Sequence, residues 1–274
     1  MPHESDPGYC SEPYKSLVRE YPDDAVYPTK DFRSEWGPVF HRGRLDGTAR
    51  VFILGQDPAQ HETIVRRILV GETGQRIQGF LAKLGIDRSY VMVNTFLYSV
   101  YGQGGGNRHR SDPSIASYRN RWIDAILSNN SIDAVVALGQ LADEAWRTYL
   151  KATSGNAFKG TYAHITHPSE PEGSSRRDRS KYQAAVAALL QNWNAALGIL
   201  RPAIKQPDRV VNLELYGTKF SPGDDVEIPE MDLPAGSPPW MRSLKNWAMR
   251  TGTTSALKRV TITVTIPTQF RPQG

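Results

Sequence analysis

The 274-residue chain is 39% hydrophobic and 22% charged, proportions typical of a soluble globular protein, and its formal net charge of +5 favours a polyanionic partner. Cys10 is the only cysteine, which excludes a disulfide framework and a cysteine-ligated zinc or iron–sulfur site. No apolar run approaches the ~20 residues needed to span a bilayer, and the first ten residues do not resemble a signal peptide, so we expect a cytoplasmic protein, associated with the nucleoid if it is bacterial.

Three segments follow one another along the chain. Residues 1–49 are irregular and rich in Pro and Tyr, and we expect them to pack on the core. Residues 50–200 alternate apolar runs with helical patterns, which predicts an α/β domain. Residues 201–274 contain strictly alternating runs at 210–216 and 260–266, typical of half-exposed strands. We expect a β-rich extension there, packed on the core or forming a small second domain.

Four short apolar runs in the α/β domain predict strands. A run without polar interruption is typical of a strand buried on both faces, as in a parallel sheet covered by helices. Helical patterns between the runs supply the crossovers. We therefore predict a central four-stranded parallel sheet flanked by helices, with strands at residues 51–54, 90–93, 134–138 and 161–165.

Polar residues follow three of these strands. Asp57 lies between Gly55 and Pro58, Asn94 ends the second strand, and His167 follows the fourth. Ligands of open α/β sheets bind at the carboxyl ends of strands, so these side chains are candidates for a site. The structural alternatives are a solvated or helix-capping Asp57, a turn residue at Asn94 and a core histidine at His167.

Arginines cluster in the loops that follow predicted strands. Arg108 and Arg110 follow three consecutive glycines, Gly104 to Gly106, which make that loop flexible unless a ligand such as a nucleic acid orders it. A second group, Arg176, Arg177 and Arg179, follows the fourth strand. A solvated charge run is the ordinary explanation, but both clusters fall where a ligand cleft is expected.

The sequence motifs at the strand ends resemble those of the uracil-DNA glycosylase superfamily. Residues 55–60 read GQDPAQ where the best-known branch has GQDPYH, Asn94 matches its strand-end asparagine, and residues 167–169 match its HPS loop. The three motifs occur in the same order, and the resemblance covers roughly residues 50–197. It implies an enzyme that flips uracil out of DNA, hydrolyses its N-glycosidic bond and leaves an abasic site.

The resemblance also assigns roles to individual residues. Asp57 and His167 would be catalytic: the carboxylate orients water and stabilises the positively charged sugar, and the histidine donates to uracil O2. Gln56 and Asn94 would bind the base, because the Asn94 amide has both the donor and the acceptor that uracil requires. No cofactor or metal is implied.

Ala59 departs from the pattern of the best-known branch, and Leu69 departs from that of a second group of branches. Ala59 stands where a tyrosine excludes the methyl group of thymine. The stretch from Gly55 to Glu62 is also similar to the GExPGxxE motif of the thermophilic branches, in which the final glutamate does the blocking, and Glu62 matches it. Leu69 replaces the phenylalanine that stacks on uracil there, so stacking would be weaker or come from Phe96 or another aromatic residue. Those branches often hold an iron–sulfur cluster, which Cys10 alone cannot ligate.

DNA contacts are expected from Ser169 and the arginine loops. The HPS loop has no leucine to fill the gap left by the flipped base, and we expect Arg176 or Arg177 to fill it or to bind phosphates. Arg108 and His109 lie in the other loop. A further branch captures uracil-DNA covalently through a histidine near this place, so a uracil-DNA binding protein acting through His109 is the alternative function.

A third hypothesis is that the chain is a nucleotide-binding α/β protein of another kind. No GxGxxG or GxxxxGK[ST] loop follows any predicted strand, which argues against it. The expected partner is therefore uracil-containing DNA, single- or double-stranded, bound by a monomer without membrane association.

Overall fold

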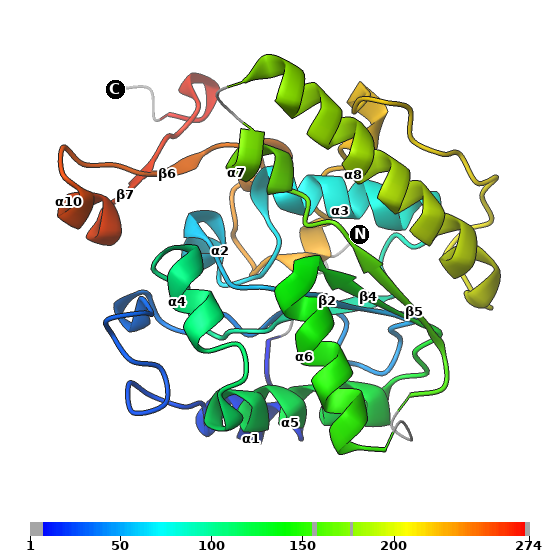
Figure 1. Cartoon of the computed structure of the whole chain (residues 1–274), viewed down its shortest axis with the longest axis horizontal. Helices are drawn as coiled ribbons and strands as arrows, with labels where there is room; N and C mark the ends of the chain where they lie inside the picture. The colour runs from blue at the N-terminus through cyan, green and yellow to red at the C-terminus, as the bar shows by residue number, and fades with distance from the viewer. Residues whose placement is uncertain (1–7, 155–157, 176–177, 272–274) are drawn as a thin grey trace.

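The computed structural model describes residues 8–154, 158–175 and 178–271 and is built around a five-stranded sheet (Figure 1). The strand order is β1-β3-β2-β4-β5. Strands β2 to β5 are parallel, whereas the short edge strand β1 pairs antiparallel with β3. The strands are β1 His41–Gly43, β2 Val51–Gly55, β3 Tyr90–Asn94, β4 Ala134–Leu138 and β5 Thr161–Ile165. The predicted α/β class and its four parallel strands are confirmed, and β1 is an addition that the sequence patterns did not indicate.

The sheet is buried on both faces because alternate residues of each central strand enter different apolar clusters. In β2, Val51 and Ile53 belong to one cluster and Phe52 and Leu54 to the other, and all four are fully buried. Side chains alternate across a strand, so an uninterrupted apolar run serves two cores at once.

Five helices supply the other halves of these two cores. On the Val51 side lie α3 (Gly71–Lys83) and α8 (Arg179–Leu200). On the Phe52 side lie α1 (Tyr14–Arg19), α5 (Pro113–Asn129) and α6 (Gly139–Ala152). The sheet thus lies between two helical layers, with α8 and α3 on one side and α6 and α5 on the other (Figure 1).

Short helices lie among the loops around the sheet. They are α2 Gln60–Val65, α4 Gly102–Arg108, α7 Glu170–Ser175, α9 Trp240–Ser243 and α10 Ser255–Val260, with 3-10 turns η1 Ser34–Trp36, η2 Arg201–Ala203, η3 Pro222–Asp224, η4 Glu230–Asp232 and η5 Thr268–Phe270. The glycine-rich stretch that we expected to be a loop is the helix α4, so the prediction of a loop is wrong. None of the helices in the described ranges combines the length and the hydrophobicity of a membrane-spanning segment.

The C-terminal segment packs on the core through residues 201–247. Asp232 is fully buried and pairs with Arg42 at 3.0 Å and with Arg44 at 2.8 Å, while the hydroxyl of Tyr90 donates to the same carboxylate. We call Asp232, Arg42, Arg44 and Tyr90 the Asp232 cluster. It fixes the segment to strands β1 and β3.

The two alternating runs of this segment differ in structure. Residues 210–216 form no strand, so that prediction is wrong. Within residues 260–266, β7 (Ile262–Val264) is a strand and pairs antiparallel with β6 (Ala248–Arg250). Val210 is 91% exposed. The alternating run at residues 210–216 therefore begins on the surface and pairs with no strand.

Candidate active site

The parallel register brings the ends of β2 and β3 together. Gly55 lies opposite Asn94 in the sheet. A Cβ atom at Gly55 would lie only 2.3 Å from the Oδ1 atom of Asn94. A side chain at position 55 would displace the Asn94 amide, which lies against the backbone just before Asp57.

The ends of β2, β4 and β5 meet at a second glycine. Gly139 opens α6 directly after β4 with φ of +80°, a conformation that favours glycine. A Cβ atom there would lie 2.4 Å from Nε2 of Gln56 and 3.1 Å from Cβ of His167. The loop after β2 and the HPS loop after β5 thus converge on one backbone position.

Asp57 is a half-buried carboxylate without an ion-pair partner among the described residues. Its Oδ2 atom accepts the backbone N–H of Val100 at 3.1 Å. Burial raises the pKa of Asp57 from 3.8 to about 6, against the opposing effects of the Val100 hydrogen bond and of the positive charges of Arg33 and Arg250. Asp57 is therefore ionised at neutral pH and protonated in mild acid.

Glu62 lies on α2, which follows the Asp57 loop. It is 6% exposed and accepts the backbone N–H of Ala59 at 3.1 Å, as a capping residue does at a helix N-terminus. Burial raises the pKa of Glu62 from 4.5 to about 7, and the negative charge of Asp57 adds a smaller contribution in the same direction. Ala59 is small and exposed, whereas the larger side chain of Glu62 is buried beneath the loop.

Leu69 is held in an unusual backbone conformation. Its φ is +52°, which is rare for a residue with a branched side chain, and it is 6% exposed. A Cβ atom at Gly74 would lie 1.7 Å from the carbonyl oxygen of Leu69, so the loop and α3 are in close contact. Strained positions of this kind are concentrated at ligand sites. Phe96 is fully buried in the core against Phe32.

His167 is oriented by Ser169 in the HPS loop. The Nδ1 atom of His167 accepts the backbone N–H of Ser169 at 3.3 Å and lies 3.0 Å from its hydroxyl oxygen. A ring nitrogen that accepts an N–H carries no proton, so in the neutral ring the proton is on Nε2. Burial lowers the pKa of His167 from 6.5 to about 4. At neutral pH the ring is an uncharged donor through Nε2.

Arg76 was not singled out from the sequence, yet it fixes the HPS loop. It lies on α3 and is buried, and it donates to the carbonyl oxygen of Pro168 at 2.6 Å. It also pairs with Glu172 of α7 and with Glu72, each at 2.9 Å. In the sequence, Glu72 and Arg76 have the spacing of an ordinary surface ion pair, so the contact with the HPS loop was not visible.

The Arg108 and His109 pair is anchored to the N-terminal segment. Arg108 pairs with Asp31, and Nε2 of His109 lies 2.9 Å from the Asp31 carboxylate. Nδ1 of His109 lies 3.5 Å from Asp112, and its ring lies against Phe32. The hydrogen bond from Arg108, followed by that from His109, lowers the pKa of Asp31 to about 2. Both ring nitrogens of His109 thus face carboxylates.

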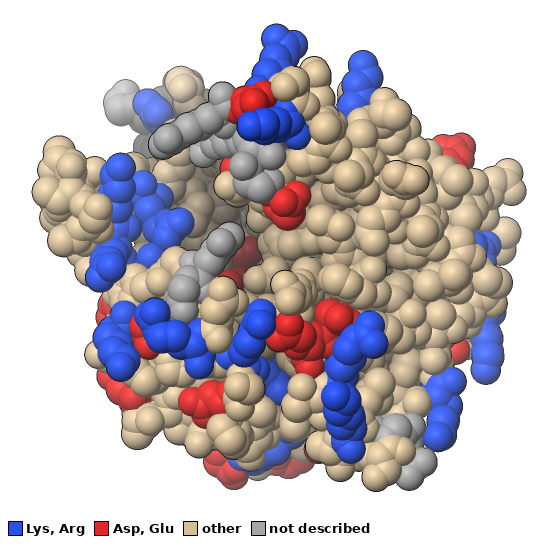
Figure 2. Space-filling model, in the orientation of Figure 1, with Lys and Arg blue, Asp and Glu red and all other residues tan. Residues whose placement is uncertain are grey.

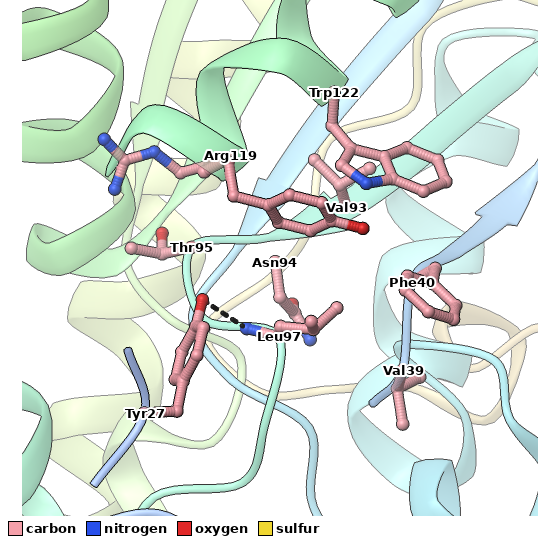
Figure 3. Close-up of a pocket in the computed structure, with 10 residues that line it drawn as sticks. Tyr27, Val39, Phe40, Val93, Asn94, Thr95, Leu97, Arg119 and Trp122 are labelled. Carbon is pink, nitrogen blue, oxygen red and sulfur yellow. Dashed lines mark hydrogen bonds between the residues drawn. The ribbon is translucent and has the colours of Figure 1, made fainter. Parts of the chain in front are cut away.

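A small pocket opens beside Asn94 on the side of α5 and the N-terminal segment (Figure 3). In it the hydroxyl of Tyr27 accepts the backbone N–H of Leu97 at 3.3 Å. Asn94 is the one predicted site residue in its lining, and Asp57 and His167 lie outside it. The lining residues are Tyr27, Val39, Phe40, Val93, Asn94, Thr95, Leu97, Tyr118, Arg119 and Trp122.

Arg176 and Arg177 lie outside the described residues. Among the residues that the structure describes, no group of three or more His, Cys, Asp and Glu side chains has an arrangement that could hold a metal ion.

The chain was compared with known proteins. A family model described as the uracil DNA glycosylase superfamily matches residues 42–193, more than half of the chain. The match begins at β1 and ends within α8, and so includes Asp57, Asn94 and His167. No curated protein matches the chain.

Proposed function

Because the chain belongs to the uracil-DNA glycosylase superfamily, which indicates DNA glycosylase chemistry, we propose that it excises uracil from DNA and leaves an abasic site. The observation that carries this proposal is the convergence of the carboxyl ends of strands β2, β3, β4 and β5. Gly55 lies against Asn94, and Gly139 lies against both Gln56 and His167. An extruded base at this edge would meet a carboxylate, an amide and a neutral imidazole donor. We further propose that a monomer performs the reaction.

The proposed reaction replaces the bond between N1 of uracil and C1′ of the sugar by a bond to water. As the N1–C1′ bond breaks, its electron pair stays on uracil, and positive charge develops on the sugar. Asp57, ionised at neutral pH, stabilises that charge and orients the water that attacks C1′. The carboxylate accepts the proton that the water loses.

His167 stabilises the departing base. Negative charge accumulates on uracil O2, and the Nε2–H of a neutral His167 is the donor aimed at it. A preorganised donor of this kind contributes about 3–4 kcal/mol to stabilisation of the transition state. Arg76 is a positioning residue in this scheme, since its bond to the Pro168 carbonyl holds the loop that carries the histidine.

Recognition of the base is assigned to Asn94, Gln56 and Glu62. The Asn94 amide pairs with O4 and N3–H of uracil and opposes the reversed pattern of cytosine. Glu62 replaces the missing tyrosine at Ala59 as the group that excludes the thymine methyl. Leu69 contributes dispersion contacts.

An excision assay on an oligonucleotide with a single uracil, followed by alkaline cleavage, tests the proposal. We expect multiple turnovers from the wild-type protein and a loss on the order of 10²- to 10⁴-fold in Asp57→Asn. Asp87→Asn is the matched control, because this exposed carboxylate pairs with Arg209 far from the sheet edge. Equal cleavage by the wild-type and Asp57→Asn proteins would contradict the proposal. A panel of oligonucleotides with other single lesions defines the base range.

Covalent capture through His109 is the alternative to hydrolysis. The contacts of His109 with Asp31 and Asp112 favour a structural part for this ring. We therefore expect no complex with uracil-DNA that survives denaturing electrophoresis. A complex that forms with the wild-type protein and not with His109→Ala would support covalent capture and contradict hydrolysis.

A further inference from the structure

The positive charge of this chain is concentrated at its C-terminal end. Residues 233–274 contain six Lys and Arg and no Asp or Glu. The other 232 residues contain 27 basic and 28 acidic residues, a formal net charge of −1. Any polyanion attracted by the overall charge is therefore attracted mainly by this segment, all of which lies beyond the residues that the family model matches.

The first two of these cations are neutralised by ion pairs and the next three are not. Arg242 pairs with Glu227 at 3.2 Å and Lys245 with Asp225. Arg250, Lys258 and Arg259 are exposed and form no ion pair with any carboxylate of the described chain.

These three cations lie on a projecting arm, which we define as residues 248–271. The arm comprises β6, α10, β7 and η5 and extends away from the body of the molecule (Figure 1). It exposes apolar side chains as well: Met249 is 53% exposed and Val260 is 60% exposed. Lys and Arg side chains gather between the arm and the body, around a hollow in the surface (Figure 2).

Two contacts attach the arm to the body of the molecule, and both involve residues near the candidate active site. The backbone N–H of Ala248 donates to His61 on α2, the helix that follows the Asp57 loop, at 3.2 Å. The carbonyl oxygen of Arg259 accepts from Arg33 at 3.3 Å, and the Arg259 guanidinium lies 5.0 Å from the ring centroid of Tyr101.

A hydrogen-bonded chain connects this second attachment to Asp57. Arg33 also donates to the carbonyl oxygen of Val100, whose N–H donates to Asp57. The charge of Arg250 itself acts on Asp57, since it holds the pKa of that carboxyl lower than burial alone would. The arm is therefore attached to the segments that carry and contact Asp57.

We propose that the arm is a DNA clamp in which Arg250, Lys258 and Arg259 bind phosphates on either side of the nucleotide delivered to Asp57, an inference that rests on the proposed function. Unpaired cations on a projecting element beside a reaction site suit a phosphate backbone, which carries regularly spaced negative charge. The exposed apolar side chains between them suit sugars and unstacked bases. Such contacts offset the cost of extruding a base, a few kcal/mol.

The test compares two variants of the full chain with the same change of charge. The arm variant carries Arg250→Gln, Lys258→Gln and Arg259→Gln. The control variant carries Arg88→Gln, Lys151→Gln and Lys205→Gln, three exposed cations near the opposite end of the sheet. Binding is measured by fluorescence anisotropy on a labelled duplex, with and without one uracil, over a range of salt concentrations. The Asp57→Asn background prevents turnover.

We expect the arm variant to bind about tenfold or more weakly at moderate salt, and its slope of log K against log salt to shrink by about 2 to 3. The control variant should keep the wild-type slope. If the arm and control variants bind alike, the clamp is wrong and the arm meets another partner, such as a protein.

Excision by the wild-type protein, measured separately, distinguishes the two proposals. Excision together with an arm variant that binds like the control rejects the clamp alone. DNA binding that depends on the arm without any excision supports the clamp and rejects the proposed reaction. A wild-type protein that does not bind DNA rejects both.

Discussion

In the Asp232 cluster each buried charge faces an opposite one, whereas at the sheet edge the buried Glu62 and the half-buried Asp57 and His167 have no ion-pair partner in the described chain. Asp232 lies between Arg42 and Arg44 and receives a hydrogen bond from Tyr90. Asp57 and Glu62 instead accept hydrogen bonds from backbone N–H groups.

The difference separates groups that hold the fold from groups prepared for chemistry. Removing one partner of a buried pair leaves an uncompensated charge in the interior, which is strongly destabilising. A buried acid without a partner has its pKa moved toward neutrality, as acids at active sites do. The same substitution, carboxylate to amide, should therefore have opposite effects on stability at the two places.

The largest effect is expected at the Asp232 cluster. Asp232→Asn leaves Arg42 buried with an unpaired charge, and we expect the free energy of unfolding to fall by about 3–5 kcal/mol. Urea denaturation followed by circular dichroism measures it. At the exposed pair of Asp87 and Arg209, Asp87→Asn should cost about 0–1 kcal/mol. Similar losses in the two variants would show that burial does not distinguish these pairs.

Glu62→Gln should change stability in a way that depends on pH. The pKa of Glu62 is raised from 4.5 in the unfolded chain to about 7 in the folded protein, so the folded state binds the extra proton between these values. Wild-type stability therefore falls as pH rises through this window. Glu62→Gln removes this loss, and its stability relative to the wild type should increase by about 3 kcal/mol between pH 4 and 8. A difference that does not change with pH would contradict the assignment.

A smaller gain is expected from Asp57→Asn. Its pKa is raised to about 6, so ionised Asp57 destabilises the folded protein above that pH. Allowing for its partial exposure, we expect the variant to be about 2 kcal/mol more stable than the wild type at pH 8 while losing activity. Urea denaturation at pH 8 and pH 4 tests the sign, since the gain should disappear at the lower pH. A loss of stability at pH 8 would place Asp57 among the groups that hold the fold.

Local sequence patterns predicted the parallel sheet because its strands are buried on both faces. The runs at residues 90–93, 134–138 and 161–165 correspond closely to β3, β4 and β5. The edge strand β1 reads HRG and has no apolar pattern, so only its pairing with β3 reveals it. Residues 210–216 have the pattern of a strand but no neighbour to pair with, and pairing is not encoded locally.

For the candidate site, the sequence indicated which residues end the strands but not what holds them. The convergence of Gln56 and His167 depends on Gly139, whose importance is visible only in three dimensions. Arg76 and Asp31 act through contacts 92 and 78 residues away along the chain. Such partners leave no periodic signal, and a charged residue in a helix or loop is ordinarily solvated.

The pH dependence of excision should respond to both Asp57 and the arm. The change expected from a substitution in the arm is the smallest of these effects. Asp57 must be ionised, so the single-turnover rate should fall about tenfold per pH unit below pH 6. His167, with a pKa of about 4, adds no loss between pH 5 and 8. Arg250 favours the ionised form of Asp57, so Arg250→Gln should raise the apparent pKa of Asp57 slightly and move the acid limb to higher pH. Arg88→Gln removes an equal charge near the other end of the sheet and should leave the limb in place. If the acid limb moves equally in both variants, the shift reflects net charge alone. If it does not move in Arg250→Gln, the charge of Arg250 does not act on Asp57.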